Sequence, residues 1–326
     1  MDKVVFIERL EGELFSLKCQ FSRAFEAVSL NGDFKDAKGI FIKPNLTYPV
    51  YKKGVTTRIE FIETLVEALR AINPGTKIYI GEGEGGYNSF SMSDALENMG
   101  FHKLKKRFSN VEIINLSKIP AKEIEIETSK GLFKIKVPAI FFDRIDFSIS
   151  CPVPKVHCMT KVTLSYKNQW GCLPDVMRLN NHYMFDYIIS KISQILKFRY
   201  AFLDGKYGLD VNGPMAGEAV EVNWFVASNS LGAFDTVVCG MMGFDWRKIN
   251  YLRIAAEYGF IPKKGDIRII GEIGALQKKF VLKRDFWNYP ALAAFRSKKL
   301  THLFYLSRWA KLLHEIMYAF RKRPIS

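Results

Sequence analysis

Cysteine is scarce in this sequence, with five residues among 326. No two of them have CxxC spacing, and this small odd number suggests neither a disulfide framework nor a cysteine motif for zinc or an iron–sulfur cluster. A reducing compartment is therefore expected. Glycine and proline are also few, 23 and 12 residues, which excludes a collagen-like or low-complexity chain. Because 48% of the residues are hydrophobic, the chain can bury a sizeable core.

Long apolar segments are lacking as well. No 18 uncharged apolar residues run together, so a membrane-spanning helix is not expected. The start of the chain carries Glu8, Glu11 and Glu13 and lacks the basic and apolar regions of a signal peptide. These features predict a cytoplasmic protein. Peripheral association with the inner face of the membrane stays open as an alternative because of the charge described next.

Acidic residues are depleted near the C-terminus. Residues 278–323 hold twelve basic and two acidic residues, and so supply ten of the formal net charge of +15. Apolar residues from Trp309 to Phe320 recur at helical spacing and predict a basic amphipathic helix. Such a helix either adsorbs to an anionic membrane surface or packs on the protein's own core, and both alternatives remain open. Nucleic-acid binding is disfavoured because no recognised nucleic-acid motif accompanies the charge.

The remainder of the chain shows alternating strand and helix patterns. Strands are predicted at 39–43, 77–81, 111–116, 133–137, 146–150 and 225–228. Helices are predicted at 58–72, 91–98, 184–197 and 232–242. This alternation predicts an α/β fold with a mainly parallel sheet, helices on both faces and a basic C-terminal helical tail. We expect an α/β core over residues 1–275 and a basic, aromatic-rich helical tail over 276–326, called the basic tail below.

Polar residues follow the first predicted strand. Lys43 and Asn45 stand at its carboxyl end, where a parallel sheet binds ligands, although Pro44 and Asn45 also suit a simple turn. Thr57 and Arg58 directly precede a predicted helix. They either cap it or, with the helix N-terminus, form an anion site.

A glycine-rich string, Gly81 to Gly86, follows the second predicted strand and contains Glu82 and Glu84. It is not GxGxxG, and its carboxylates would repel a phosphate, so a Rossmann cofactor is disfavoured. The two carboxylates instead suit a divalent cation or acid–base chemistry, with a solvated turn as the alternative. Asp204 and Asp235 are further candidates for metal ligands or for helix and turn caps.

The densest polar string runs from Pro152 to Gly171. Its basic residues include Lys155, His157 and Lys167, and small apolar and hydroxyl residues separate them instead of acidic partners. Crowding of this kind lowers lysine pKa values if the site is closed to water. A neutral His157 would then act as a general base on an anionic substrate held by the lysines. The alternative is an exposed basic loop.

In their order along the chain these strings resemble the family called domain of unknown function 362. The resemblance covers roughly residues 38–260 and rests on Ile42–Asn45, Gly81–Glu84, Pro152–His157, Val162-Thr163, Lys167-Asn168, Asp204-Gly205 and Gly213-Pro214. Val153 and Val156 stand where the family has lysine and threonine, which leaves any role of those two side chains open. Many members resemble fusions to a ferredoxin module. This chain lacks its cysteine motifs, so no iron–sulfur cluster is expected.

The main functional hypothesis is an enzyme that acts on a small anionic or phosphorylated substrate, with His157, Lys155 and Lys167 as catalytic residues. Its substrate-binding residues would be Lys43, Asn45, Thr57, Arg58 and Asn168, and a divalent metal, if bound, would use Glu82, Glu84, Asp204 and Asp235. One alternative is a noncatalytic membrane-surface or assembly protein that works through the basic tail. Another rests on a remote likeness to the nickel-dependent hydroxy-acid racemases. We expect the main candidates to converge on one edge of the sheet.

Overall fold

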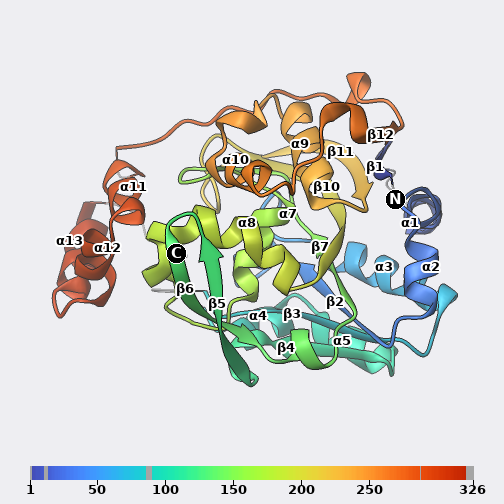
Figure 1. The fold of residues 1–326 in the computed structure, drawn as a ribbon, viewed down its shortest axis with the longest axis horizontal. Helices are drawn as coiled ribbons and strands as arrows, with labels where there is room; N and C mark the ends of the chain where they lie inside the picture. The colour runs from blue at the N-terminus through green and yellow to red at the C-terminus, as the bar shows by residue number, and fades with distance from the viewer. Residues whose placement is uncertain (1, 11–13, 86–89, 287, 321–326) are drawn as a thin grey trace.

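The computed structural model describes residues 2–10, 14–85, 90–286 and 288–320. Its centre is a mainly parallel sheet (Figure 1). In spatial order the strands are β12 (Ile267–Ile270), β1 (Lys3–Arg9), β11 (Glu218–Ser228), β10 (Phe198–Asp210), β7 (Phe147–Cys151), β2 (Gly39–Pro44), β3 (Lys77–Glu82) and β4 (Val111–Asn115). Strand β11 runs antiparallel to both of its neighbours, and the other adjacent pairs in this order are parallel.

Helices cover both faces of the sheet because successive side chains of a strand point to opposite faces. In β2, Ile40 and Ile42 enter one hydrophobic core and Phe41 enters the other. The core around Ile40 includes α1 (Leu14–Ala27), α2 (Leu30–Lys35), α3 (Ile59–Ile72), α4 (Met92–Asn98) and α5 (Phe101–Arg107). The core around Phe41 includes α6 (Ile140–Asp143), α7 (Ser165–Asn168), α8 (Phe185–Ile195), α9 (Leu231–Met241) and α10 (Asn250–Glu257).

Two hairpins lie outside this order of strands. Strands β5 (Ala121–Thr128) and β6 (Gly131–Pro138) form a separate two-stranded sheet, so the strand expected at 133–137 does not belong to the main sheet. It stays apart because Ile135 and Val137 cover the second core while the alternate side chains face solvent. Strands β8 (Lys155–His157) and β9 (Lys161–Thr163) form the other hairpin, which joins β10 through the pairing of Lys155 with Leu209.

The predicted fold class is confirmed, but the sequence analysis missed six strands: β1, β5, β8, β9, β10 and β12. Strand β1 begins the chain, and β10 is 13 residues long. Asp204 was a candidate turn cap, but Asp204 and Gly205 both lie within β10, opposite Phe225 and Trp224. A Cβ on Gly205 would lie 2.3 Å from the Trp224 carbonyl oxygen, so glycine is needed there for close contact of the two backbones.

The basic tail forms α11 (Asn288–Arg296), α12 (Lys298–Thr301) and α13 (Ala310–Phe320). In Figure 1 these helices project to one side of the α/β body. Phe295 is buried against the ring of Phe185, which anchors α11, whereas Leu312 and Ile316 on α13 are 53% and 51% exposed. In the described part of the chain no helix is long and apolar enough to cross a membrane.

Candidate functional site

The predicted site residues lie around the carboxyl ends of β2, β3 and β7 and on the segment that follows β7. Lys43 lies near the end of β2 and Glu82 at the end of β3, while α7 carries Lys167 and Asn168. The β8–β9 hairpin adds Lys155 and His157. Parallel pairing of β2 with both β3 and β7 brings these carboxyl ends to one edge of the sheet.

Lys43 and Glu82 form a buried ion pair. The Lys43 Nζ atom lies 2.5 Å from Glu82 Oε2 and 2.6 Å from the Pro44 carbonyl oxygen, and its side chain is fully buried. Glu82 Oε2 also accepts a hydrogen bond of 2.9 Å from the Leu46 backbone N–H. Glu82 is therefore held by charge and hydrogen bonding within the protein.

Gly171 covers this ion pair closely. A Cβ on Gly171 would lie 1.5 Å from Glu82 Oε1 and 3.2 Å from the Lys43 Cε atom. The Gly171 carbonyl oxygen also accepts a hydrogen bond from Gly83 N–H at 2.7 Å. The segment after α7 can reach the end of β3 because position 171 has no side chain.

Lys155 is fully buried, and its hydrogen-bond acceptors are uncharged. Its Nζ donates to the Val55 carbonyl oxygen at 2.6 Å, to Asn45 Oδ1 at 3.0 Å and to Thr47 Oγ1 at 3.4 Å. Burial holds the pKa of Lys155 well below its ordinary value, and the positive charge of Lys167 lowers it further. An ammonium group here lacks the full compensation that a carboxylate in contact would provide.

Lys167 is only partly buried, so it is the more accessible of these two lysines. Burial lowers its pKa to about 8; Cys158 opposes this shift, and the positive charge of Arg178 adds to it. Its Nζ lies 5.7 Å from the centre of the Phe185 ring. An amine with a pKa near 8 gains and loses a proton close to neutral pH, as a general acid or base must.

His157 is placed to donate a hydrogen bond. Its Nδ1 accepts hydrogen bonds from the backbone N–H groups of Met159 at 3.1 Å and Thr160 at 3.4 Å. Burial holds the pKa of His157 well below its ordinary value, and the charges of Lys167 and Lys155 lower it further. In the neutral ring the proton is then assigned to Nε2. This assignment revises the expected role, because a neutral ring in this tautomer donates from Nε2 and is not poised as a general base.

Three of the expected substrate-binding residues use their polar atoms within the protein. Thr57 Oγ1 donates to the Cys151 carbonyl oxygen and accepts from Asn45 N–H, each at 2.8 Å. Asn168 Nδ2 donates to the Lys43 carbonyl oxygen at 3.0 Å and to Ser150 Oγ at 3.2 Å. Asn45 Oδ1 accepts from Lys155. These contacts fix the lysines in place, so Asn45, Thr57 and Asn168 lie beside them as positioning residues.

Arg58 and Asp204 form a second ion pair at the same edge of the sheet. The Arg58 backbone N–H donates to Asp204 Oδ2 at 2.7 Å, and its Nε donates to Oδ1 at 2.9 Å. Desolvation opposes the charged form of Arg58, but the charge of Asp204 and its hydrogen bonds leave the arginine pKa above its ordinary value. Asp204 thereby fixes the start of α3.

The other two candidate metal ligands also bind protein groups. Glu84 accepts hydrogen bonds from Met92 N–H at 2.9 Å and Asn115 Nδ2 at 2.7 Å. Asp235 accepts from both the N–H (2.9 Å) and the hydroxyl (2.5 Å) of Ser165, and burial raises its pKa to about 7. Among the described residues no three histidine, cysteine or acidic side chains are grouped to hold a metal ion. The four carboxylates therefore do not form the expected metal site.

Several groups near the lysines were missed by the sequence analysis. Arg178 is buried, and its guanidinium donates to the Leu173 carbonyl oxygen at 3.2 Å and to that of Glu84. Burial and the charges of Lys167 and Arg178 lower the pKa of His182 to about 3. Both residues lie on the 3-10 helix Arg178–Met184, whose sequence lacks a recognisable motif.

The basic tail also reaches this region. The ring of Phe295 on α11 lies 4.5 Å from the ring of His182, centre to centre, and Arg284 Nε donates to the Cys158 carbonyl oxygen at 2.7 Å. Cys158 is one of the groups that act electrostatically on Lys167, and His182 is one of those that act on His157. The tail therefore packs beside the candidate site, a placement that the sequence pattern did not predict.

The sequence model of the family described as "Domain of unknown function (DUF362)" matches residues 40–240. A thylakoid-associated protein of Synechocystis sp. is 26% identical over 129 residues, which are 37% of this chain and 40% of that protein. The lactate racemase apoprotein of Thermoanaerobacterium thermosaccharolyticum superposes with a TM-score of 0.48 at 12% identity, covering 71% of this chain and 55% of that one. A Thermotoga maritima protein gives a TM-score of 0.33 at 12% identity, covering 65% and 55%. The chain thus spans well under two thirds of each of these relatives.

Proposed function

The chain belongs to the family described as a domain of unknown function, DUF362, and on that premise we propose that it is an enzyme for a small anionic substrate, carboxylated or phosphorylated. The observation that carries this proposal is the excess of positive charge around Lys155 and Lys167. Lys43 and Arg178 add to it, and Glu82 is the carboxylate, among the described residues, that acts on both of these lysines. An anion bound beside the lysines would supply the missing negative charge.

In this proposal Lys155, whose Nζ already donates to three protein acceptors, attracts the anion through its charge. Lys167, which is partly exposed, exchanges a proton with the anion. His157 donates a hydrogen bond from Nε2 to an oxygen of the substrate, and Lys43 contributes its charge from within the ion pair with Glu82. Asn45, Thr57 and Asn168 hold the lysines in position, and the Arg58–Asp204 ion pair fixes the start of α3. No step is assigned to a metal, because the described carboxylates do not fit one. The scarcity of cysteine supports a cytoplasmic location.

Binding of an anion should be coupled to proton uptake, which gives the proposal a specific test. An anion raises the pKa values of the nearby lysines, so at pH 8 a half-protonated Lys167 takes up part of a proton. Titration calorimetry with inorganic phosphate, glycerol phosphate and lactate, in buffers of different ionisation enthalpy, measures this uptake. Lactate also tests the hydroxy-acid alternative. Affinity should fall as the pH rises through 8, because Lys167 then loses its charge.

Two substitutions and one control complete the test. Lys155→Met and Lys167→Met should each weaken anion binding by roughly tenfold or more, and Lys167→Met should also abolish much of the proton uptake. Lys191→Met removes the same charge from the solvent-exposed side of α8, where Nζ donates to the Glu127 carbonyl oxygen, and should leave binding unchanged. Thermal melts of all three variants verify folding. Anion binding that is equal in the three variants would contradict the proposed site.

A further inference from the structure

The basic tail carries an apolar surface that the α/β body does not cover. The exposed fractions are 40% for Leu303, 41% for Leu306, 50% for Trp309, 53% for Leu312 and 51% for Ile316. Trp309, Leu312 and Ile316 are three and four residues apart, and this spacing places them on one face of the helical segment. We name these five residues the apolar tail face.

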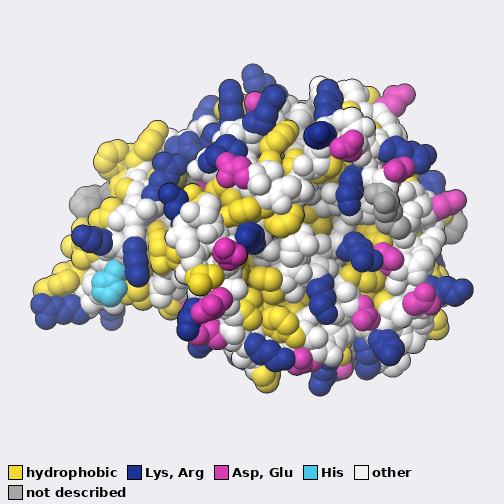
Figure 2. All heavy atoms as spheres, in the orientation of Figure 1, with side chains coloured by type: hydrophobic (Ala, Val, Ile, Leu, Met, Phe, Trp, Pro, Cys, Tyr) yellow, Lys and Arg dark blue, Asp and Glu magenta, His cyan; other side chains and the backbone are white. Residues whose placement is uncertain are grey.

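Positively charged side chains accompany this face. Lys298, Lys299, Arg308 and Lys311 are all exposed, and Glu315 is the acidic residue in the described stretch 288–320. Figure 2 shows hydrophobic and Lys or Arg side chains side by side over the projecting helices. Exposed apolar side chains and exposed cations at neighbouring positions are the features of a helix that lies in the interface of an anionic membrane.

The attachment of the tail leaves this face available. Helix α11 is fixed to the body through Phe295, which packs on Phe185 and His182. Helix α12 is joined to α11 through Thr301, whose hydroxyl donates to the Ala294 carbonyl oxygen at 2.5 Å. Helix α13 packs on the π-helical turn His302–Leu306, which also belongs to the basic tail. Ala310 of α13 is buried, whereas Leu312 and Ile316 are about half exposed.

We propose that the apolar tail face docks on an anionic lipid surface. Charge complementarity favours this occupant over a second copy of the chain, because two tails with ten net positive charges each would repel one another. Four of the five residues of the apolar tail face are aliphatic and offer nucleic acid no stacking surface. With 11 residues, α13 is about 16 Å long, too short to cross a hydrocarbon core of about 30 Å, so it would lie in the plane of the interface.

The test is vesicle flotation of the full chain with phosphatidylcholine alone and with about one third phosphatidylglycerol, at low and high salt. Binding should require the anionic lipid and weaken at high salt, because surface charges are screened over about 8 Å at physiological ionic strength. Tryptophan emission should shift to the blue on binding, and a Trp309→Phe variant should show a smaller shift because this exposed ring enters the interface.

Matched variants separate the apolar and the charged contributions. The Leu312→Ser, Ile316→Ser double variant should reduce partitioning by roughly tenfold or more. Leu132→Ser, on the β5–β6 hairpin with 66% exposure, should not change it. Lys298→Gln with Lys311→Gln should lower partitioning roughly thirtyfold, since each cation near the surface contributes about a fivefold factor.

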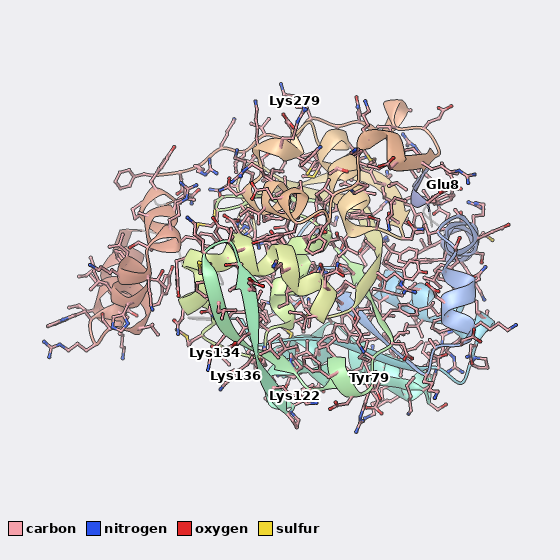
Figure 3. All side chains as sticks on the ribbon, in the orientation of Figure 1. Glu8, Tyr79, Lys122, Lys134, Lys136 and Lys279 are labelled. Carbon is pink, nitrogen blue, oxygen red and sulfur yellow. The ribbon has the colours of Figure 1, made fainter. Side chains whose placement is uncertain are left out.

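The charge control uses Lys134 and Lys136, exposed lysines on the same hairpin (Figure 3). Changing both to Gln should leave vesicle binding nearly unaffected. All variants expose their substituted side chains, so melting temperatures should match the parent protein. Equal binding to neutral and anionic vesicles would overturn the proposal. So would a dimer that dissociates in the Leu312→Ser, Ile316→Ser variant, or retention of vesicle binding in both tail variants.

Discussion

The buried Lys43–Glu82 ion pair of the candidate site can be tested quantitatively through its contribution to the free energy of unfolding. In the Glu82→Gln variant, the Lys43 ammonium keeps the Pro44 carbonyl oxygen but loses its carboxylate at 2.5 Å. Since the lysine side chain is fully buried and that of Glu82 is 6% exposed, water cannot replace the lost charge. Removing one partner of a buried pair costs about 3–5 kcal/mol. We therefore expect the free energy of unfolding to fall by about that amount.

A surface ion pair supplies the matched control. Glu8 pairs with Arg23 at 2.7 Å, with side-chain exposures of 26% and 50% (Figure 3 labels Glu8). Exposed pairs contribute about 0–1 kcal/mol, so Glu8→Gln should change stability by no more than that. Both substitutions replace a glutamate by its isosteric amide. The comparison therefore isolates the effect of burial on the same chemical change.

Urea unfolding at pH 7 measures these differences as shifts in midpoint at constant slope. The double variant Lys43→Met, Glu82→Gln should recover about 2 kcal/mol or more relative to Glu82→Gln, because no unpaired buried cation remains. A loss below about 1 kcal/mol for Glu82→Gln would refute the reasoning. The reasoning would also be refuted if the double variant lost as much unfolding free energy as the two single variants lose together.

Three further outcomes follow from the site geometry. Pulse acetylation followed by mass spectrometry should show Lys167 half-reactive near pH 8, since its neutral amine appears as the pH rises through its pKa of about 8, and half-reaction near pH 10 would contradict this. Gly171→Ala should destabilise the protein in urea as strongly as Glu82→Gln does, because its Cβ would overlap Glu82 Oε1, whereas Gly274→Ala, with open space around its Cβ, should be neutral. His157→Ala should lower the melting temperature and reduce the free energy of unfolding by about 1–3 kcal/mol, because two backbone N–H groups lose their acceptor. An unchanged melting temperature would contradict these hydrogen bonds.

The fold class could be predicted from local pattern because burial imposes a period on each element. The apolar run Ile40 to Ile42 contributes side chains to two cores, which is possible when the run is a strand covered on both faces. The pattern over residues 58–72 has a single apolar stripe, which is typical of a helix that packs on a sheet. Strand β10 was missed because Asp204 and Gly205 are turn residues in most contexts. Here their strand conformation depends on pairing with β11, more than ten residues away along the chain.

The sequence by itself determined which chemistry this protein carries: lysines and a histidine at strand ends, and a cation-rich C-terminal end, because residue type and local period are properties of the chain. The tertiary structure decided how that chemistry is deployed. In the folded chain Glu82 pairs with Lys43, Asp235 accepts hydrogen bonds from Ser165, and Lys155 donates to uncharged acceptors. The fold also turns Nδ1 of His157 toward two backbone N–H groups. Charge pairing, burial and tautomer depend on distances of a few ångströms between segments far apart in sequence, and only the folded chain fixes those distances.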